Sequence, residues 1–110
     1  MKTVLALGHD GMGHGDKELG YRILKTFLQK SVSLNKLEAI VLFNSGVKLA
    51  AKDSPVAAEL HQLQEAGVDI RPCGTCIDQF ELRDRMAIDQ ISNMDAIIQE
   101  LDNAEKIITL

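Results

Sequence analysis

Aromatic residues are scarce in this chain, whose 110 residues include three Phe, one Tyr and no Trp. Proteins that bind single-stranded nucleic acid commonly stack the bases on aromatic side chains, and this sequence offers few. Basic residues are not in excess either, because 12 Lys and Arg face 16 Asp and Glu, which gives a formal net charge of −4. Such a charge provides no attraction to phosphate backbones or anionic lipids. We therefore expect neither a nucleic-acid partner nor a membrane partner.

Long hydrophobic segments and cysteines are also few. The apolar run at residues 1–7 is too short for a signal peptide, and the polar residues His9 and Asp10 follow it closely. The only two cysteines are Cys73 and Cys76. Two closely spaced cysteines without an export signal indicate a reducing, cytoplasmic environment and a functional site, not a disulfide framework.

The hydrophobic pattern predicts a single α/β domain over residues 1–110. Uninterrupted apolar runs are typical of strands that are covered on both faces. The candidates are residues 3–7, 39–43, 68–71 and 107–110, with a weaker strand at 88–91. Helical patterns lie between them, and because strands that alternate with helices favour right-handed crossovers, we expect a parallel sheet. The predicted fold is a three-layer α/β/α sandwich with a mainly parallel, five-stranded sheet.

Local signals suggest where the helices begin and end. Asp16 and Asn93 can each cap a helix, and the pair Ser54–Pro55 is typical of a helix start. Gly67 is well placed to end the helix that follows Pro55. Thr75 lies three residues before Asp78, the spacing of a capping box, which predicts a short helix from residue 76 to about 85.

The loops after the first three strands should meet at the carboxyl edge of the sheet, where open α/β folds place their binding sites. One loop is rich in glycine, the second follows the strand at 39–43, and the third contains both cysteines. The residues we expect to line a pocket there are Gly13, Asp16, Asn44, Ser45, Gly46, Gly74 and Thr75.

The Cys-Gly-Thr-Cys loop carries the most specific chemistry. We expect Cys73 to end a strand and Cys76 to open a helix. Unpaired amides and the helix dipole at such a junction favour thiolate over thiol, and a thiolate can carry, exchange or oxidise sulfur. The alternative is a pair of packed, inert thiols, since free cysteine is often just a small apolar residue.

The glycine-rich loop at residues 8–16 leaves more alternatives open. Its amides could cradle an anion, although its glycine spacing matches neither a Walker motif nor the dinucleotide fingerprint. The simpler interpretation, which the absence of those motifs favours, is a strand-to-helix connection in which Asp16 caps the next helix. His9 and His14 could complete a zinc site with the two cysteines, but the spacing matches no zinc motif. We predict no resident metal and no cofactor.

Four segments in register, at residues 12–20, 43–49, 73–76 and 91–94, resemble the DsrE-like family of small sulfur-relay proteins. The resemblance is closest to the DsrE-type domain of the YedF-like proteins associated with selenium metabolism. It implies a parallel α/β/α fold that assembles as a homotrimer or hexamer. It also implies that Cys73 carries a persulfide, received from a donor protein and passed to an acceptor protein.

The resulting hypothesis is a sulfurtransferase-like sulfur carrier that uses Cys73 and Cys76. Two alternatives from other classes stay open. One is a non-catalytic, oligomeric module that binds a small ligand or a metal. The other is a thiol-disulfide oxidoreductase that uses the two cysteines as a redox pair.

Overall fold

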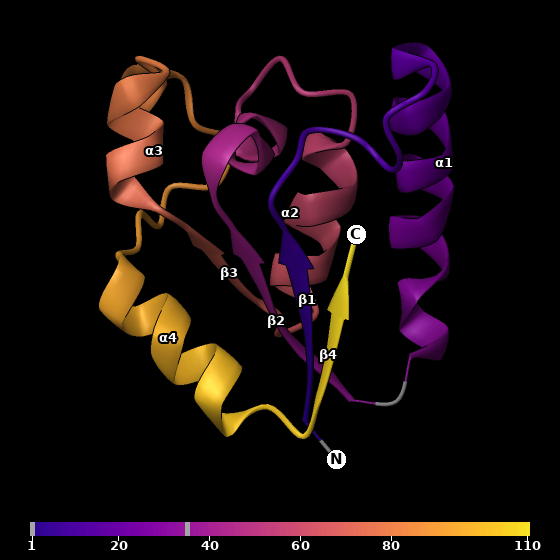
Figure 1. Ribbon diagram of the computed structural model, residues 1–110, viewed down its shortest axis with the longest axis vertical. Coiled ribbons are helices and arrows are strands. Elements are labelled where there is room, and N and C mark those ends of the chain that lie inside the picture. Colours follow the sequence, from indigo (N-terminus) through magenta and orange to yellow (C-terminus); the bar gives the residue numbers. More distant parts are fainter. Residues whose placement is uncertain (1, 35) are drawn as a thin grey trace.

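The computed structural model describes residues 2–34 and 36–110. Within them four strands form one parallel sheet in the order β3-β2-β1-β4. The strands are β1 (Thr3–Leu7), β2 (Leu37–Leu42), β3 (Asp69–Pro72) and β4 (Lys106–Thr109). Figure 1 shows their carboxyl ends pointing the same way, so the loops that follow them gather at one edge. The predicted α/β class and parallel sheet are confirmed.

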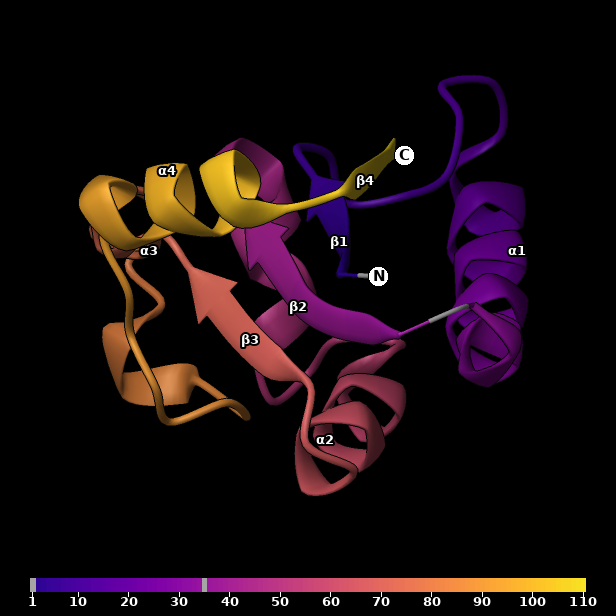
Figure 2. The ribbon, with the colours of Figure 1, turned by 90° about the horizontal axis from the view of Figure 1, so that it is seen from below.

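Helices cover both faces of this sheet. They are α1 (Lys17–Lys30), α2 (Ala57–Glu65), α3 (Gly74–Gln79) and α4 (Met94–Asn103). Figure 2 shows α1 and α2 on one side of the strands and α4 on the other, which produces three layers. Short 3₁₀ segments supplement them: η1 (Ser31–Ser33), η2 (Asn44–Ala50) and η3 (Arg83–Arg85).

The predicted fifth strand at residues 88–91 is wrong. Ile88 is buried, so the apolar signal there reflects burial and not strand pairing. The chain between η3 and α4 pairs only at two isolated bridges, one from Met86 to Ala51 and one from Ser92 to Cys73. The second bridge cannot grow into a ladder because the chain turns into α3 immediately after Cys73.

Three of the five predicted helix ends are confirmed. The carboxylate of Asp16 accepts a hydrogen bond from the amide of Leu19 at 2.9 Å and caps α1. Asn93 caps α4 through the amide of Ala96 at 2.8 Å. Gly67, with φ +99°, follows the end of α2 in the left-handed conformation that glycine adopts readily.

The other two helix starts differ from the prediction. Helix α2 begins at Ala57, because the Ser54 hydroxyl accepts from the amide of Val56 and forms a turn ahead of the helix. Helix α3 begins at Gly74 and ends at Gln79, so it starts earlier and is shorter than expected.

The core explains why the central strands are apolar without alternation. Every residue of β1 is buried, as are the last four residues of β2, because helices pack on both sides of this pair. Strand β4 lies at the edge of the sheet, and most of its residues are exposed. Among the helices of the described residues, none is long and apolar enough to cross a bilayer.

Substitution of Gly46 by Ala should destabilise the fold. A Cβ at this position would lie 2.1 Å from the carbonyl oxygen of Leu7, which is backbone and cannot move aside. We expect a loss of about 1–3 kcal/mol or more in the free energy of unfolding, as for other overpacked sites. Chemical denaturation measures it, with Gly15→Ala as the control, because a Cβ there meets nothing within 4 Å. Equal stability of the two variants would contradict the close approach.

Candidate functional site

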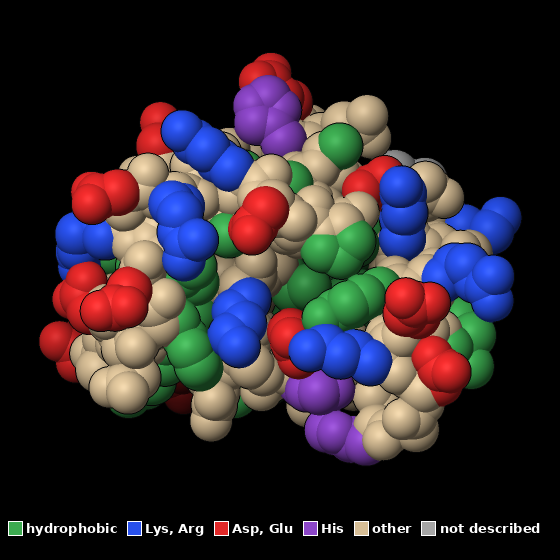
Figure 3. Space-filling model, turned by 90° about the horizontal axis from the view of Figure 1, so that it is seen from above, with side chains coloured by type: hydrophobic (Ala, Val, Ile, Leu, Met, Phe, Trp, Pro, Cys, Tyr) green, Lys and Arg blue, Asp and Glu red, His purple; other side chains and the backbone are tan. Residues whose placement is uncertain are grey.

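The candidate site lies at the carboxyl edge of the sheet, where the loops after β1, β2 and β3 meet. Figure 3 looks down on this edge and shows basic and acidic side chains interspersed around exposed apolar groups. No side-chain charge of one sign dominates the view. The edge therefore presents no field of a single sign to an approaching ligand.

Cys73 is the residue at which β3 gives way to α3. Its amide donates to the carbonyl of Leu42 at 2.9 Å and so continues the pairing of β3 with β2. Its own carbonyl accepts from the amide of Ile77 at 3.0 Å, which makes it the N-cap residue of α3. The side chain is only 3% exposed. Cys73 thus holds a nearly buried sulfur at a rigid junction.

Cys76 lies in the first turn of α3 and is partly exposed. Its Sγ accepts a hydrogen bond from the backbone amide of Asn44 at 3.1 Å. Asn44 is the first residue of η2 and adopts a φ of +51°, a conformation that asparagine tolerates better than most residues. The start of the segment after β2 is therefore in direct contact with α3.

The pKa of the Cys76 thiol is raised, which corrects the expectation that the helix start favours its thiolate. Burial is the largest cause, because a thiolate loses more hydration than a thiol. The amide of Asn44 lowers the pKa, but the neighbouring Cys73 thiol raises it further. At neutral pH Cys76 is thus a protonated thiol whose neighbour is the Cys73 sulfur.

Gly74 and Thr75 complete the cysteine loop. The amide of Gly74 donates to the carbonyl of Ser92 at 2.9 Å, and a Cβ on Gly74 would come within 3.0 Å of that oxygen. Thr75 is exposed and does not form the predicted capping box with Asp78. Asp78 instead accepts from Arg83 Nε at 2.8 Å and from Nη2 at 3.0 Å. This ion pair is the main reason why the pKa of Asp78 is lowered.

The loop after β2 contributes Ser45 and Gly46 beside Asn44. Ser45 is half-buried, and Gly46 is buried with its Cα pressed against the end of β1. The amide of Phe43 also donates to the carbonyl of Leu7 at 3.1 Å. These contacts fix the start of η2 and hence the position of the Asn44 amide that faces Cys76.

The glycine-rich loop forms a hollow of its own beside α1. The hollow has a volume of about 240 Å³ and is lined by His9, Asp10, Gly11, Gly13, His14, Gly15, Lys17 and Gly20. Gly13 has a φ of +86°, which requires glycine. Asp16 lies at the end of this loop, where its carboxylate already occupies the helix start as the cap of α1. An anion could not use the Leu19 amide without displacing that carboxylate.

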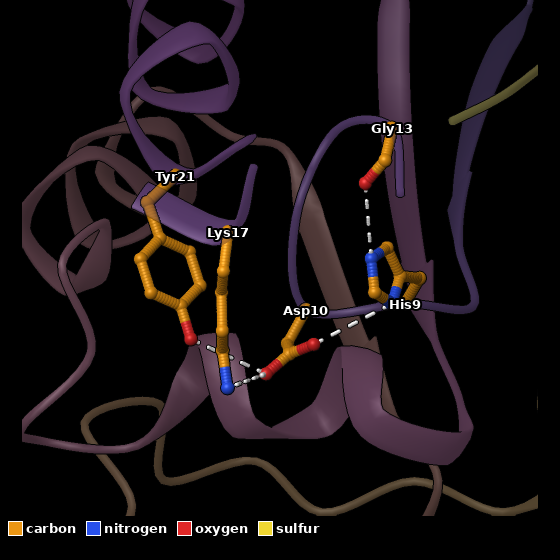
Figure 4. A network of polar contacts seen from close by, with 5 residues as sticks. All are labelled: His9, Asp10, Gly13, Lys17 and Tyr21. Atoms are coloured by element: carbon orange, nitrogen blue, oxygen red, sulfur yellow. Dashed lines mark hydrogen bonds and ion pairs between the residues drawn. The ribbon is translucent and has the colours of Figure 1, made fainter. Parts of the chain in front are cut away.

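Asp10 organises this hollow, as Figure 4 shows. One carboxylate oxygen lies 3.4 Å from His9 Nδ1, and the other lies 3.5 Å from the Tyr21 hydroxyl and 4.0 Å from Lys17 Nζ. His9 Nε2 lies 3.3 Å from the carbonyl oxygen of Gly13. Both nitrogens of His9 are therefore already occupied by contacts within the loop.

The zinc site considered from the sequence is not assembled in the described part of the chain. No group of three or more His, Cys, Asp or Glu side chains comes together there in a way that could hold a metal ion. His9 and His14 stack on each other, with ring centroids 4.1 Å apart, and do not approach as two ligands would.

The predicted pocket residues fall into two groups. Asn44 contacts Cys76 through its amide, and Ser45, Gly46, Gly74 and Thr75 belong to the same two adjoining segments. Gly13 and Asp16 lie in the loop beside α1, whereas Figures 1 and 2 both show α3 on the opposite side of the sheet. Within one chain the two groups therefore lie apart along the shared edge, and of the predicted residues Gly13 lines the hollow beside α1.

Two side chains near the cysteines were missed by sequence reasoning. Lys48 on η2 places its ammonium 4.5 Å from the centroid of the Phe80 ring, a cation–π contact. Phe80 follows Cys76 by four residues, the spacing of neighbours on one helix face, and this signal was available in the sequence. The contact of Phe80 with Lys48 could not be predicted from the sequence, because no local pattern links residues 48 and 80.

The fold and the cysteine junction define a small α/β protein with a pair of thiols at the sheet edge. The family model for DsrE/DsrF-like proteins matches residues 1–110, so this chain belongs to the DsrE/DsrF-like family. Among curated proteins, none matches it significantly.

Solved structures with the same fold cover nearly the whole chain. One is a protein of unknown function, MTH1491 from Methanobacterium thermoautotrophicum, with a TM-score of 0.71, 16% identity, and coverage of 99% of this chain and 98% of that one. The ychN protein from E. coli has a TM-score of 0.68 and 18% identity, with complete coverage of both chains. The conserved protein of unknown function BT1422 from Bacteroides thetaiotaomicron has a TM-score of 0.68 and 23% identity, covering 98% and 94%. Because all three identities are below 25%, these similarities show a shared fold alone.

Because burial raises the pKa of Cys76, its alkylation should need a higher pH than that of a free cysteine peptide. We expect the rate at which iodoacetamide labels Cys76 in the Cys73→Ser variant to rise with pH. The pH at the midpoint of this rise should be higher than for an unfolded peptide containing residues 73–79. Mass spectrometry of the labelled peptide measures this. The same variant labelled in denaturant is the control, and a folded midpoint below it would contradict the raised pKa.

Proposed function

We propose that this protein is a sulfur carrier that accepts persulfide sulfur at the Cys73–Cys76 pair and passes it on. Membership of the DsrE/DsrF-like family, which is generally linked to sulfur relay, supports this function. The observation that carries the proposal is that the two cysteines lie close together at the start of α3, where the nearness of Cys73 raises the pKa of Cys76. A lone buried thiol would lack this second sulfur.

In the proposed reaction Cys73 is the carrier. Its thiolate attacks the outer sulfur of a donor persulfide, a new S–S bond forms as the donor's S–S bond breaks, and the donor leaves as a thiolate. Cys76 keeps its proton because its pKa is raised, so its S–H can donate a hydrogen bond to a persulfide on the neighbouring Cys73. Hydrogen bonds to charged acceptors are the stronger ones, and this bond would stabilise the terminal anion of the persulfide.

The test is intact-protein mass spectrometry after incubation with a persulfide-generating cysteine desulfurase. We expect the wild type to gain the mass of one sulfur, which reduction removes, and Cys73→Ser to gain none. Cys76→Ala, which removes the S–H donor, should still load sulfur but release it faster. Equal loading of Cys73→Ser and wild type would refute Cys73 as the carrier.

The same measurement separates the alternatives. Because Cys73 and Cys76 adjoin, a redox pair is the second candidate, and a loss of two hydrogens on mild oxidation without any sulfur gain would favour it. A selenide-based donor in place of the sulfur donor tests the selenium-related, YedF-like role. Gain of selenium but not sulfur would favour that role.

We further propose that the carrier is a homo-oligomer, a trimer or a hexamer, that exchanges sulfur with separate donor and acceptor proteins. Large apolar side chains on α4 and β4 lie open to solvent in the single chain. Met94 is 48% exposed, Ile98 55% and Ile107 47%. Met94 and Ile98 are four residues apart on α4 and so share one face of that helix, and exposed apolar side chains that share a face are typical of surfaces that a partner covers.

Light scattering after size-exclusion chromatography should give three or six times the 12.1 kDa mass of the chain. Ile98→Glu should lower that mass, because it would bury a charge at the interface. Gln99→Glu, which adds the same charge at the next exposed position of α4, should leave it unchanged. A monomeric wild type would contradict the proposal.

A further inference from the structure

The contact between η2 and α3 continues beyond the cysteine. Asn44 meets Cys76, and four residues further along each segment Lys48 meets Phe80. Four residues of α-helix advance the chain by about 6 Å. A cation therefore lies roughly one helical turn away from the Cys76 thiol, on the same face of α3.

A hollow opens beside this cation. Its volume is about 330 Å³, and its lining residues are Lys48, Ala51, Asp53, Phe80, Leu82 and Arg85. This is the lower end of the range of small-molecule sites, which runs from about 300 to 1,000 Å³. Its lining thus combines apolar side chains with two cations and one carboxylate.

The backbone around the hollow is held in place from both sides. The amide of Lys52 donates to the carbonyl of Arg85 at 2.8 Å, and the amide of Ala87 donates to the carbonyl of Ala50 at 2.8 Å. An isolated antiparallel bridge joins Ala51 to Met86 between these two bonds. The hollow is thus formed before any ligand arrives, which lowers the cost of binding.

Its charged groups lack partners of opposite charge among the described residues. In residues 2–34 and 36–110, neither Lys48 nor Arg85 forms an ion pair with a carboxylate, and Asp53 has no basic partner. Arg83, by contrast, is fully engaged by Asp78. Two cations and one carboxylate suit a ligand that carries two carboxylates and one ammonium group.

We propose that this hollow binds a low-molecular-weight peptide thiol, or its persulfide, as the sulfur donor for the Cys73–Cys76 pair. This inference rests on the proposed sulfur-carrier function. Lys48 and Arg85 bind the carboxylates, Asp53 binds the ammonium group, and Phe80 packs against the chain between them. A peptide extends by about 3.3–3.6 Å per residue, so a carboxylate held at Lys48 lets a thiol one or two residues away reach the cysteines.

The transfer needs no external oxidant or reductant. The Cys73 thiolate attacks the outer sulfur of the small persulfide, and the donor's S–S bond breaks with its electron pair on the inner sulfur. The proton of the donor's outer sulfur passes to that leaving thiolate. The products are the Cys73 persulfide anion and the free small thiol, which then leaves the hollow.

Binding is tested first with S-methylglutathione, which has the two carboxylates and the ammonium group but cannot give up sulfur. Calorimetry on the full chain should show binding that Lys48→Glu weakens by about tenfold or more, because the variant sets a like charge against a carboxylate. Lys52→Glu makes the same charge change at an exposed neighbour outside the hollow and should bind as the wild type does. Equal binding by all three proteins, or none by the wild type at millimolar ligand, would overturn the proposal.

Sulfur loading is then followed with glutathione persulfide and, separately, with inorganic polysulfide. Lys48→Glu should load about tenfold more slowly from the peptide donor and at the wild-type rate from polysulfide, which has no carboxylate to bind. An equal effect on both donors would overturn the assignment of the hollow. If no donor loads sulfur while S-methylglutathione still binds at Lys48, the sulfur-carrier function fails and the thiol-binding hollow stands.

Discussion

The close approach of η2 to the end of β1 is the constraint from which the rest of the edge follows. Gly46 lies so near the carbonyl of Leu7 that no side chain fits, and Phe43 is bonded to the same carbonyl. This contact fixes the direction of η2. Asn44 at its start then faces Cys76, and Lys48 near its end faces Phe80. One backbone contact thus positions both the amide at the sulfur and the cation beyond it.

Two opposing effects act on the cysteines. The helix start and the Asn44 amide favour a charged Cys76, while burial and the neighbouring thiol oppose it, and burial is the larger effect. As a result the two cysteines differ in their proposed roles. Cys76 stays protonated and can donate a hydrogen bond, and Cys73, the proposed carrier, can accept it. A helix dipole alone is worth less than the hydration that a thiolate loses in a partly dry site.

The rest of the edge is polar but not uniform in charge. The hollow beside α1 is held together internally, since Asp10 contacts His9, Tyr21 and Lys17, and Asp16 caps the helix. The hollow beside α3 differs, because Lys48, Asp53 and Arg85 face it without partners of opposite charge in the described residues. Unpaired charges in a preformed hollow are available to a ligand, whereas paired ones mainly stabilise the loop.

The sequence by itself determined the α/β class, the parallel strands and the caps at Asp16 and Asn93, because these depend on hydrophobic periodicity and on hydrogen bonds between residues near in the chain. It also placed the cysteines at the end of the third strand. Only the tertiary structure decided the number of strands, since Ile88 is buried by packing without pairing. It also decided the protonation of Cys76 and the partner of Phe80, because burial and contacts between residues distant in sequence leave no local pattern.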